Sequence, residues 1–551
     1  MTADALRVEG LTVALPASGQ RAHAAEDISF SLRRGETLCM VGESGSGKSV
    51  VAHAVMGLLP ASLRLTAGRI LLEGEEIQGL GEAGFRRIRS RRLSMIFQEP
   101  MTALNPLMRI GDQISEVMRV HGVGDRRAIR DRMFELAEQV RLPDPATILR
   151  AYPMQLSGGQ RQRVMIAMAL ALKPAVLIAD EPTTALDVTT QAQILAIIRE
   201  MQETYGTGVL FVTHDFGVVS EIADRVVVME KGKAVEEGLA ADVLTRPAHP
   251  YTRRLIAAVP ALSADAGPAR EEPRPAALEV KRLSKRFIRR SGLFSRRTVV
   301  EAVRGVDLTV GRGEIFGIIG ESGSGKSTLG RLIVRLARPD SGDILVDEVN
   351  LARLDDRALR PLRRNVQMIF QDPFGSLNPR QTIGTILGIV LSLGGSDAAA
   401  ARQEATRLLD LVGLDAGALD RFPHEFSGGQ RQRISLARAL ATEPRLLIAD
   451  EAVSALDVVI QAQILDLLAD LRRRLGLTVL FITHDLRVAG RICDRVAVML
   501  RGEIVEQGRP AEIFAAPRHP YTASLIASIP GWDPGRRHQP VEQRQRKETA
   551  R

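Results

Sequence analysis

One segment of this 551-residue chain is written twice, and that repeat constrains the fold more than any other feature. The octapeptide GESGSGKS occurs at Gly42–Ser49 and at Gly320–Ser327, and SGGQRQR follows at Ser157–Arg163 and Ser427–Arg433. In both copies 23 residues separate the first serine of SGGQRQR from the aspartate of a later ADE motif. A period near 270 residues is too long for a stacked repeat array, so we expect two homologous domains.

Each copy ends on a similar stretch, HPYTRRLIAAVP at His249–Pro260 and HPYTASLIASIP at His519–Pro530. Between the copies the chain is rich in alanine, proline and charged residues, which is typical of an exposed linker. The sequence therefore predicts a first domain over residues 1–260, a linker over 261–277, a second domain over 278–535 and a basic tail over 536–551.

The net charge of +9 does not by itself indicate binding to nucleic acid, because the excess is concentrated in two segments. Residues 281–297 contain eight basic and no acidic side chains, and residues 536–551 contain six basic and two acidic ones, so the rest carries −3. We expect a solvated loop and a solvated tail, with contact to anionic lipid or a partner as the alternative. No nucleic-acid partner is expected.

Other classes of protein are excluded by composition. The chain has two cysteines, Cys39 and Cys493, which are too few for a disulfide scaffold or a four-cysteine zinc site, so we expect reduced thiols in a cytosolic interior. No run of 18 apolar residues occurs, and no membrane-spanning helix is expected. The first ten residues lack a basic region followed by an apolar one, so we expect no secretion signal.

Short apolar runs precede the repeated motifs. Thr37–Val41 and Ile315–Ile319 lead into the GESGSGKS loops, and similar runs lead into the ADE and THD motifs. Because glycine, proline or polar residues bound them, these runs are typical of buried strands in a largely parallel sheet. Apolar residues between Gln98 and Ser157 recur at helical spacing, which predicts a helical insertion. The expected fold class is α/β.

The GESGSGKS loops match the phosphate-binding loop (P-loop) pattern GxxxxGK[ST]. Glycines let backbone N–H groups curl around phosphates, and the N-terminus of a helix stands behind them. The lysine is expected to reach the β- and γ-phosphates, and the next serine to ligate Mg²⁺. The predicted nucleotide-binding residues of the loops are Gly42, Ser44, Gly45, Gly47, Lys48 and Ser49, with Gly320, Ser322, Gly323, Gly325, Lys326 and Ser327.

An acidic pair follows an apolar run in each copy. Asp180 and Asp450 stand where a carboxylate that orients Mg²⁺ belongs, and Glu181 and Glu451 follow directly, where they could polarise an attacking water. Such pairs can also simply cap the next segment, but the two P-loops favour the catalytic interpretation. ATP and Mg²⁺ are therefore the expected cofactors.

LSGGQ at Leu156–Gln160 and FSGGQ at Phe426–Gln430 resemble the signature of ATP-binding cassette (ABC) proteins. The segments around Gln98 and Gln371, the ALD turns and the THD histidines complete that family's motif set. The resemblance implies two tandem nucleotide-binding domains, each a P-loop sheet core with an antiparallel β subdomain and a helical subdomain. It also implies two ATP molecules sandwiched head to tail, with the signature of one domain serving the nucleotide of the other. SGG before a helix suits that role, because hydroxyl, N–H groups and helix dipole face one anion.

The resemblance assigns roles residue by residue. The expected catalytic residues are Glu181, Glu451, His214 and His484, with the histidines at the γ-phosphate. The expected Mg²⁺ ligands are Ser49, Gln98, Asp180, Ser327, Gln371 and Asp450, and the two glutamines also contact nucleotide. Further nucleotide contacts are expected from Ser157, Gly158, Gly159, Gln160, Asp187, Ser427, Gly428, Gly429, Gln430 and Asp457.

A narrower resemblance lies in FQEPMTALNP at Phe97–Pro106 and FQDPFGSLNPRQTIG at Phe370–Gly384, which are similar to the peptide, opine and nickel uptake branch, as are the HPYT endings. The copies resemble D-type and F-type subunits fused in that order, as in glutathione-type importers. This implies an ATPase driving peptide import, with nickel, an opine or another small solute as alternative cargo. It also implies two transmembrane permease subunits, an extracytoplasmic solute-binding protein and a place at the cytoplasmic face of the inner membrane. No cysteine-rich tail follows either HPYT segment, so we expect no iron–sulfur cluster.

Two other classes of tandem ABC protein fit the sequence less well. ABC proteins that act on ribosomes carry a long, charged helical linker, whereas the segment between the copies is short and rich in proline and alanine. DNA-repair ABC ATPases carry coiled-coil or zinc-bearing insertions, which two cysteines and the absence of long heptads disfavour.

The two ATP sites are predicted to differ at the adenine, which this family stacks on an aromatic side chain. Phe287 fits that role in the second copy, whereas Leu15 stands at the matching place in the first, unless His23 covers the base. Stacking on a base is worth about 1–3 kcal/mol, so ATP should bind roughly tenfold more weakly at the first site. Leu15→Phe should tighten and Phe287→Leu should weaken binding in site-resolved titrations. If neither change exceeds twofold, Phe287 belongs to the strand core instead.

Overall fold

The computed structural model describes residues 4–16, 21–184, 186–260, 274–289, 298–393, 397–454 and 456–531. The chain divides into two compact units whose main boundary lies between Val259 and Pro260. The predicted tail, the positions Ala185 and Ala455 and most of the predicted linker lie outside the described residues. Among the described residues, no helix combines the length and apolar character needed to span a bilayer.

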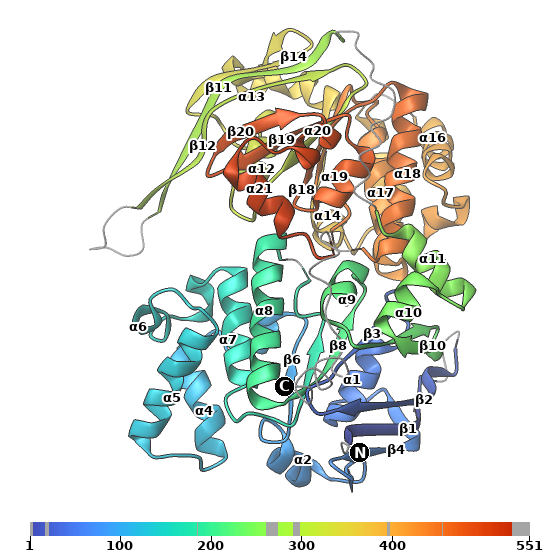
Figure 1. The fold of residues 1–551 in the computed structure, drawn as a ribbon. Helices are drawn as coiled ribbons and strands as arrows, with labels where there is room; N and C mark the ends of the chain where they lie inside the picture. Colours follow the sequence, from blue (N-terminus) through green and yellow to red (C-terminus); the bar gives the residue numbers. More distant parts are fainter. Residues whose placement is uncertain are drawn as a thin grey trace. The chain divides into compact units, whose positions relative to one another are not determined.

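A six-stranded sheet forms the centre of each unit (Figure 1). In the first unit the order is β10 (Lys233–Leu239), β9 (Arg225–Glu230), β3 (Thr37–Val41), β8 (Gly208–Thr213), β7 (Val176–Asp180) and β6 (Leu93–Ile96). In the second it is β20 (Glu503–Gly508), β19 (Arg495–Leu500), β13 (Ile315–Ile319), β18 (Thr478–Thr483), β17 (Leu446–Asp450) and β16 (Val366–Ile369). All neighbours pair in parallel except β9 with β10 and β19 with β20. The predicted buried, largely parallel sheet is confirmed, because β3, β7, β13 and β17 are buried along their whole length.

A four-stranded antiparallel sheet accompanies each central sheet. Its order is β2 (His23–Arg33), β1 (Asp4–Ala14), β4 (Arg64–Leu72) and β5 (Glu75–Glu76) in the first unit. In the second it is β12 (Thr298–Gly311), β11 (Ala276–Arg289), β14 (Ser341–Val346) and β15 (Val349–Asn350). These sheets are the antiparallel β subdomains that the family resemblance implies.

Helices fill the predicted insertion between Gln98 and Ser157 and its counterpart in the second copy. The first unit has α3 (Pro100–Ala103), α4 (Ile110–Val120), α5 (Arg126–Gln139), α6 (Pro145–Ile148) and α7 (Gly158–Ala169), and α8 (Val188–Tyr205) follows β7. The second has α14 (Pro373–Ser376), α15 (Ile383–Ser392), α16 (Ala398–Leu411) and α17 (Gly428–Leu440), and α18 (Val458–Leu475) follows β17. Figure 1 shows α4, α5 and α7 together on one side of the first unit, away from β1, β2 and β4.

The helix after each P-loop joins the two sheets into one core. In the first unit α1 (Lys48–Met56) places Val51, Ala52 and Val55, all fully buried, in a cluster with residues of both sheets. In the second unit α12 (Lys326–Ile333) does the same with Leu329 and Leu332. Burying these side chains therefore fixes where each P-loop stands.

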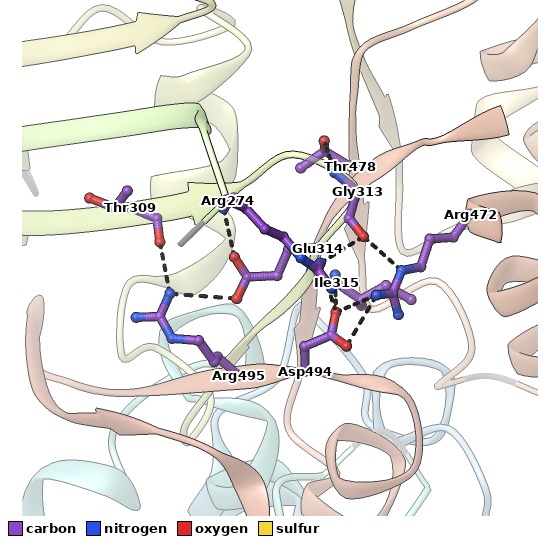
Figure 2. Close-up of polar contacts among 10 residues, drawn as sticks. Arg274, Thr309, Gly313, Glu314, Ile315, Arg472, Thr478, Asp494 and Arg495 are labelled. Atoms are coloured by element: carbon purple, nitrogen blue, oxygen red, sulfur yellow. Dashed lines mark hydrogen bonds and ion pairs between the residues drawn. The ribbon is translucent and has the colours of Figure 1, made fainter. Parts of the chain in front are cut away.

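Buried charges organise the opposite edge of the central sheet, where the parallel strands begin. Glu314, only 5% exposed, accepts the N–H of Gly311 at 2.6 Å and pairs with Arg495 at 3.5 Å (Figure 2). Asp494 accepts the N–H of Ile315 at 2.9 Å and pairs with Arg472 at 2.9 Å. Because these residues start or flank β13 and β19, their contacts hold the strand register at the edge away from the P-loop.

Two expectations about the chain between the copies need correction. Lys281–Arg289 was expected in a solvated loop, but these residues lie in β11, where the ammonium of Lys285 pairs with Asp340 at 2.8 Å. Pairing with β12 and β14 overrides the run of positive charge. Residues 290–297 lie outside the described residues. The last two residues of the predicted linker, Ala276 and Ala277, also belong to β11.

The two cysteines occupy complementary places in the two copies. In the first copy Cys39 lies in β3, and Ala223 directly follows the helix α9 (Phe216–Ile222). At the aligned positions of the second copy, Gly317 lies in β13 and Cys493 directly follows the helix α19 (Leu486–Ile492). Both thiols are free and buried, as expected. A Cβ at Gly317 would lie 2.8 Å from the Sγ of Cys493. The absence of a side chain at Gly317 therefore leaves room for the Sγ of Cys493.

Gly317→Cys should overfill this core and lower the free energy of unfolding by about 1–3 kcal/mol. Adding Cys493→Ala should restore most of the loss, because the pair then has the sizes found in the first unit. Calorimetric unfolding of the single and double variants, with Cys493→Ala alone as control, measures this. Equal stability of Gly317→Cys and the wild type would contradict the packing described here.

Candidate functional site

The glycines of each P-loop are required by geometry. Gly42 and Gly47 have φ of 153° and 103°, conformations that L side chains rarely adopt. A Cβ at Gly42 would lie 2.2 Å from the carbonyl oxygen of Met229, and one at Gly47 would lie 2.4 Å from that of Ala24. Gly320 and Gly325 repeat the arrangement in the second unit, at 2.3 and 2.2 Å from carbonyl oxygens.

The P-loop lysine is folded back onto its own loop. Lys48 is 4% exposed, and its Nζ donates to the carbonyl oxygens of Gly42 at 2.8 Å and Glu43 at 2.9 Å. Lys326 makes the same contacts with Gly320 at 2.7 Å and Glu321 at 2.8 Å. A buried ammonium at the start of a helix, beside backbone N–H groups, creates a strongly anion-binding environment.

The predicted magnesium ligands lie together. The hydroxyl of Ser49 donates to Oδ1 of Asp180 at 2.9 Å, and Ser327 donates to Asp450 at 2.9 Å. Burial raises the pKa of Asp180, and the hydrogen bond from Ser49 offsets this only in part. A hydroxyl and a buried carboxylate supply hard oxygen ligands, which suit Mg²⁺ held mainly by substrate phosphates and water. The residues present therefore fit the ion.

Glu181 contacts two predicted site residues, Gln98 and His214, and one further residue, Thr184, in the first unit. Its Oε2 accepts from Nε2 of Gln98 at 3.0 Å and from the hydroxyl of Thr184 at 3.0 Å, and its Oε1 lies 3.1 Å from Nδ1 of His214. Glu181 has φ of 46°, an uncommon conformation outside glycine. Its strained backbone and its partners together fix the carboxylate beside Asp180, the last residue of β7.

The second unit repeats this cluster with one difference. Oε2 of Glu451 accepts from Gln371 at 2.7 Å, and Oε1 lies 3.3 Å from Nδ1 of His484. Glu451 has φ of 48°. Ser454, which aligns with Thr184, donates its hydroxyl to the backbone carbonyl of Glu451 at 3.0 Å. Sequence reasoning missed Thr184, although TTALD in one copy and VSALD in the other marked the position.

Charge coupling between Glu181 and His214 sets their ionisation. Burial would raise the pKa of the Glu181 carboxyl, but the hydrogen bond and charge of His214, with the charge of Lys48 and the bond from Thr184, lower it to about 2. Burial would also lower the pKa of His214, yet the bond and charge of Glu181, with the charge of Asp215, raise it. Each side chain of the pair therefore stabilises the charged form of the other.

The signature serines begin helices in both units. Oγ of Ser157 accepts the N–H of Gln160 at 3.3 Å, and Oε1 of Gln160 accepts the N–H of Ser157 at 2.9 Å, a capping box at the start of α7. Ser427 and Gln430 form the same box at the start of α17. The SGG segments thus stand at helix N-termini, as expected, with Ser157 and Ser427 exposed. Their pairing with the P-loop of the other unit stays a prediction.

Glycines in the signatures also permit close helix packing. A Cβ at Gly159 would lie 2.7 Å from the Cγ2 of Thr190 in α8, and one at Gly429 would lie 2.3 Å from the Cγ2 of Ile460 in α18. Gly158 and Gly428 meet nothing this close. The second glycine of each SGG is therefore required for packing whatever it does for nucleotide.

The ALD aspartates have a structural function in this chain. Asp187 caps α8 by accepting the N–H of Thr190 at 2.9 Å, and Asp457 caps α18 by accepting the N–H of Ile460 at 3.0 Å. Their predicted nucleotide contacts stay predictions.

At the adenine positions the structure separates the alternatives for Phe287. The Phe287 ring is 45% exposed, and the ammonium of Lys285 lies 5.6 Å from its centroid, so Phe287 is no part of the strand core. Leu15 is half-buried, and its N–H donates to the carbonyl of Ala22 at 2.9 Å. A contact that sequence reasoning missed is Arg21, whose guanidinium donates to the carbonyl of Gly45 at 3.0 Å in the P-loop. The motif pattern did not indicate that Arg21 lies beside the P-loop of the first unit.

Known proteins resemble this chain along nearly its whole length. A family model of ABC transporters matches residues 25–184 and 303–454, and one of the C-terminal region of oligopeptide/dipeptide transporters matches 235–292 and 505–551. The glutathione import ATP-binding protein GsiA of Salmonella typhimurium (strain LT2) is 48% identical over 98% of this chain and 91% of its own length. GsiA of Escherichia coli (strain K12) is 49% identical over 96% and 90%. Among solved structures, the dimeric ATP-binding cassette MJ0796 bound to ADP and Pi is 30% identical and covers 42% of this chain, with a TM-score of 0.38.

Duplicated P-loops on parallel sheets, each beside an ordered glutamate, define a tandem P-loop ATPase. The chain belongs to the ABC transporter family, whose model matches more than half of it, and it is one of the ATP-hydrolysing subunits. Its second match belongs to the oligopeptide/dipeptide branch of these transporters.

In nucleotide-free protein, the imidazole of His214 should titrate above the ordinary value of 6.5, because the Glu181 carboxylate stabilises its charged form. Glu181→Gln should lower that pKa while preserving side-chain shape. NMR titration of the histidine signals, assigned by their loss in His214→Gln, measures both. An unchanged His214 titration in Glu181→Gln would show that the carboxylate does not set the charge on the ring.

Proposed function

We propose that this chain hydrolyses ATP at two composite sites to drive the import of glutathione or a related short peptide. The observation that supports this choice of cargo is sequence identity: the chain is 48% identical, over 98% of its length, to a glutathione import ATP-binding protein. Nickel, an opine or another small solute is the second candidate, because these cargoes share the uptake branch that the Gln98 and Gln371 segments resemble.

In each site the chain's own residues would divide the work. Lys48 and the P-loop N–H groups bind the phosphates, while Ser49, Asp180 and Gln98 hold Mg²⁺, which neutralises phosphate charge when bound. The counterparts in the second unit are Lys326, Ser327, Asp450 and Gln371. The signature of the other unit completes each site from the opposite side.

The ion pair of Glu181 with His214 implies an order of events. A carboxylate with a pKa of about 2 is a weak base, so Glu181 polarises water poorly while His214 is its partner. Movement of His214 toward the γ-phosphate would remove that partner and raise the basicity of Glu181. Hydrolysis would thus be suppressed until nucleotide draws the histidine away.

Import requires components that this chain does not supply. We infer two transmembrane permease subunits as partners, because the chain resembles import ATP-binding proteins and carries the C-terminal region of oligopeptide/dipeptide transporters. An extracytoplasmic solute-binding protein would deliver cargo to them. The ATPase would then act at the cytoplasmic face of the inner membrane, with no nucleic acid involved.

Glu181→Gln combined with Glu451→Gln should retain ATP binding and nearly abolish hydrolysis, since the charge that polarises water is lost while the phosphate cradle remains. Phosphate release and equilibrium binding of ATP measure the two effects. Glu138→Gln, at an exposed position in α5, is the matched control. Near wild-type turnover by the double variant would refute the assignment.

The cargo is tested separately, in proteoliposomes that contain this chain and the permeases encoded beside it. Glutathione presented with the cognate binding protein should stimulate ATP hydrolysis and accumulate inside, whereas Ni²⁺ or an opine should not. Stimulation by Ni²⁺ or an opine alone would overturn the peptide proposal and leave the ATPase assignment intact.

A further inference from the structure

The HPYT segment fixes the start of a helix in each unit. His249 accepts the N–H of Tyr251 through Nδ1 at 3.3 Å, at the start of α11 (Pro250–Ala258). The carboxylate of Glu236 in β10 accepts the N–H groups of Ala248 at 2.7 Å and His249 at 3.0 Å. The helix is thus tied to the edge strand of the central sheet.

The second unit repeats these contacts at the start of α21 (Pro520–Ala527). His519 accepts the N–H of Tyr521 at 3.1 Å, and Glu506 accepts the N–H groups of Arg518 at 2.9 Å and His519 at 3.1 Å. The same four-residue motif therefore gives the same local structure twice.

The tyrosine of each motif reaches the P-loop. The hydroxyl of Tyr251, a residue 4% exposed, accepts the N–H of Glu43 at 3.1 Å. The hydroxyl of Tyr521 accepts the N–H of Glu321 at 3.0 Å. Glu43 and Glu321 are the second residues of the two GESGSGKS loops, more than 190 positions away in sequence.

This contact and the lysine contact act on one peptide group. The Gly42–Glu43 peptide presents its carbonyl to Nζ of Lys48 at 2.8 Å and its N–H to the hydroxyl of Tyr251. The Gly320–Glu321 peptide lies between Lys326 and Tyr521 in the same way. Rotation of either peptide plane would break both bonds, so the tyrosine limits where the lysine can be held. Aligned hydrogen bonds through a peptide also strengthen one another.

We propose that Tyr251 and Tyr521 are positioning residues of the two ATP sites, which hold the first peptide of each P-loop so that Lys48 and Lys326 are aimed at nucleotide phosphate. The proposal rests on the proposed role of these lysines in binding phosphate. It gives the HPYT extension a function inside each nucleotide site. Burial raises the pKa of Tyr251 to about 12, so its hydroxyl stays protonated and neutral at physiological pH.

The test compares Tyr251→Phe and Tyr521→Phe in the full-length chain without permeases or cargo. Each change keeps the ring and removes the acceptor for the loop N–H. ATP affinity and KM should weaken roughly fivefold at the altered site, which corresponds to about 1 kcal/mol, while kcat at saturating ATP stays within twofold. Photolabelling with 8-azido-ATP, followed by cleavage at a protease site introduced between residues 261 and 273, assigns the loss to one unit.

Two controls separate positioning from simple stabilisation of the extension. Leu255→Ala and Leu525→Ala remove buried side chains, 2% and 0% exposed, from α11 and α21 and leave both tyrosine hydroxyls present. They should lower the midpoint of thermal unfolding and leave ATP affinity unchanged. Arg253→Ala, at an exposed position of α11, installs the residue found at the aligned position Ala523 and should also leave affinity unchanged.

The proposal is overturned if both phenylalanine variants keep wild-type ATP affinity, or if the leucine variants weaken ATP binding as much as they do. It is also overturned if kcat falls at saturating ATP with KM unchanged. Because nucleotide binding is measured without import, failure here leaves the proposed cargo untouched. Conversely, a chain that imports another solute would still show the tyrosine effect.

Discussion

The buried ammonium of the P-loop lysine is the interaction on which the rest of each unit depends. Lys48 can be desolvated only because the carbonyls of Gly42 and Glu43 receive it, and those carbonyls face it only because two glycines adopt conformations closed to other residues. The helix that begins at Lys48 is held between two sheets. Sheet order, the salt bridges at the far edge and the HPYT helix all serve to place one loop.

Much of this arrangement could be predicted from the sequence, because motif spacing and apolar runs report on the chain locally. The strands before GESGSGKS and the clustering of Gln98, Glu181 and His214 follow from parallel strands that end at one edge. The features that the sequence does not predict depend on contacts between distant segments. Nothing in LSKRFIRR indicates that Lys285 pairs with Asp340, so the sequence predicts a loop where the structure has a strand. The HPYT motif marked a branch of the family, yet its contact with Glu43 crosses 208 positions and has no periodic signal.

The two units share their central chemistry and differ at its margins. The lysine, serine–aspartate and glutamate–histidine contacts agree to within a few tenths of an ångström in the two copies. The differences lie where a side chain touches the machinery from outside: Thr184 against Ser454, and Leu15 with Arg21 against Phe287. Such peripheral substitutions can tune affinity and rate separately at each site without endangering the phosphate cradle.

The large and small residues at Cys39 and Ala223 are reversed at the aligned positions Gly317 and Cys493. This reversal bears on how the two halves of a duplicated gene stay distinct. Copying β3 over β13 by recombination would bring two sulfur-bearing side chains into a space built for one. The product would fold less well than its parent. The cores thus act as a barrier to homogenisation of the repeats, which protects the independent history of the two nucleotide sites even where their motifs are identical.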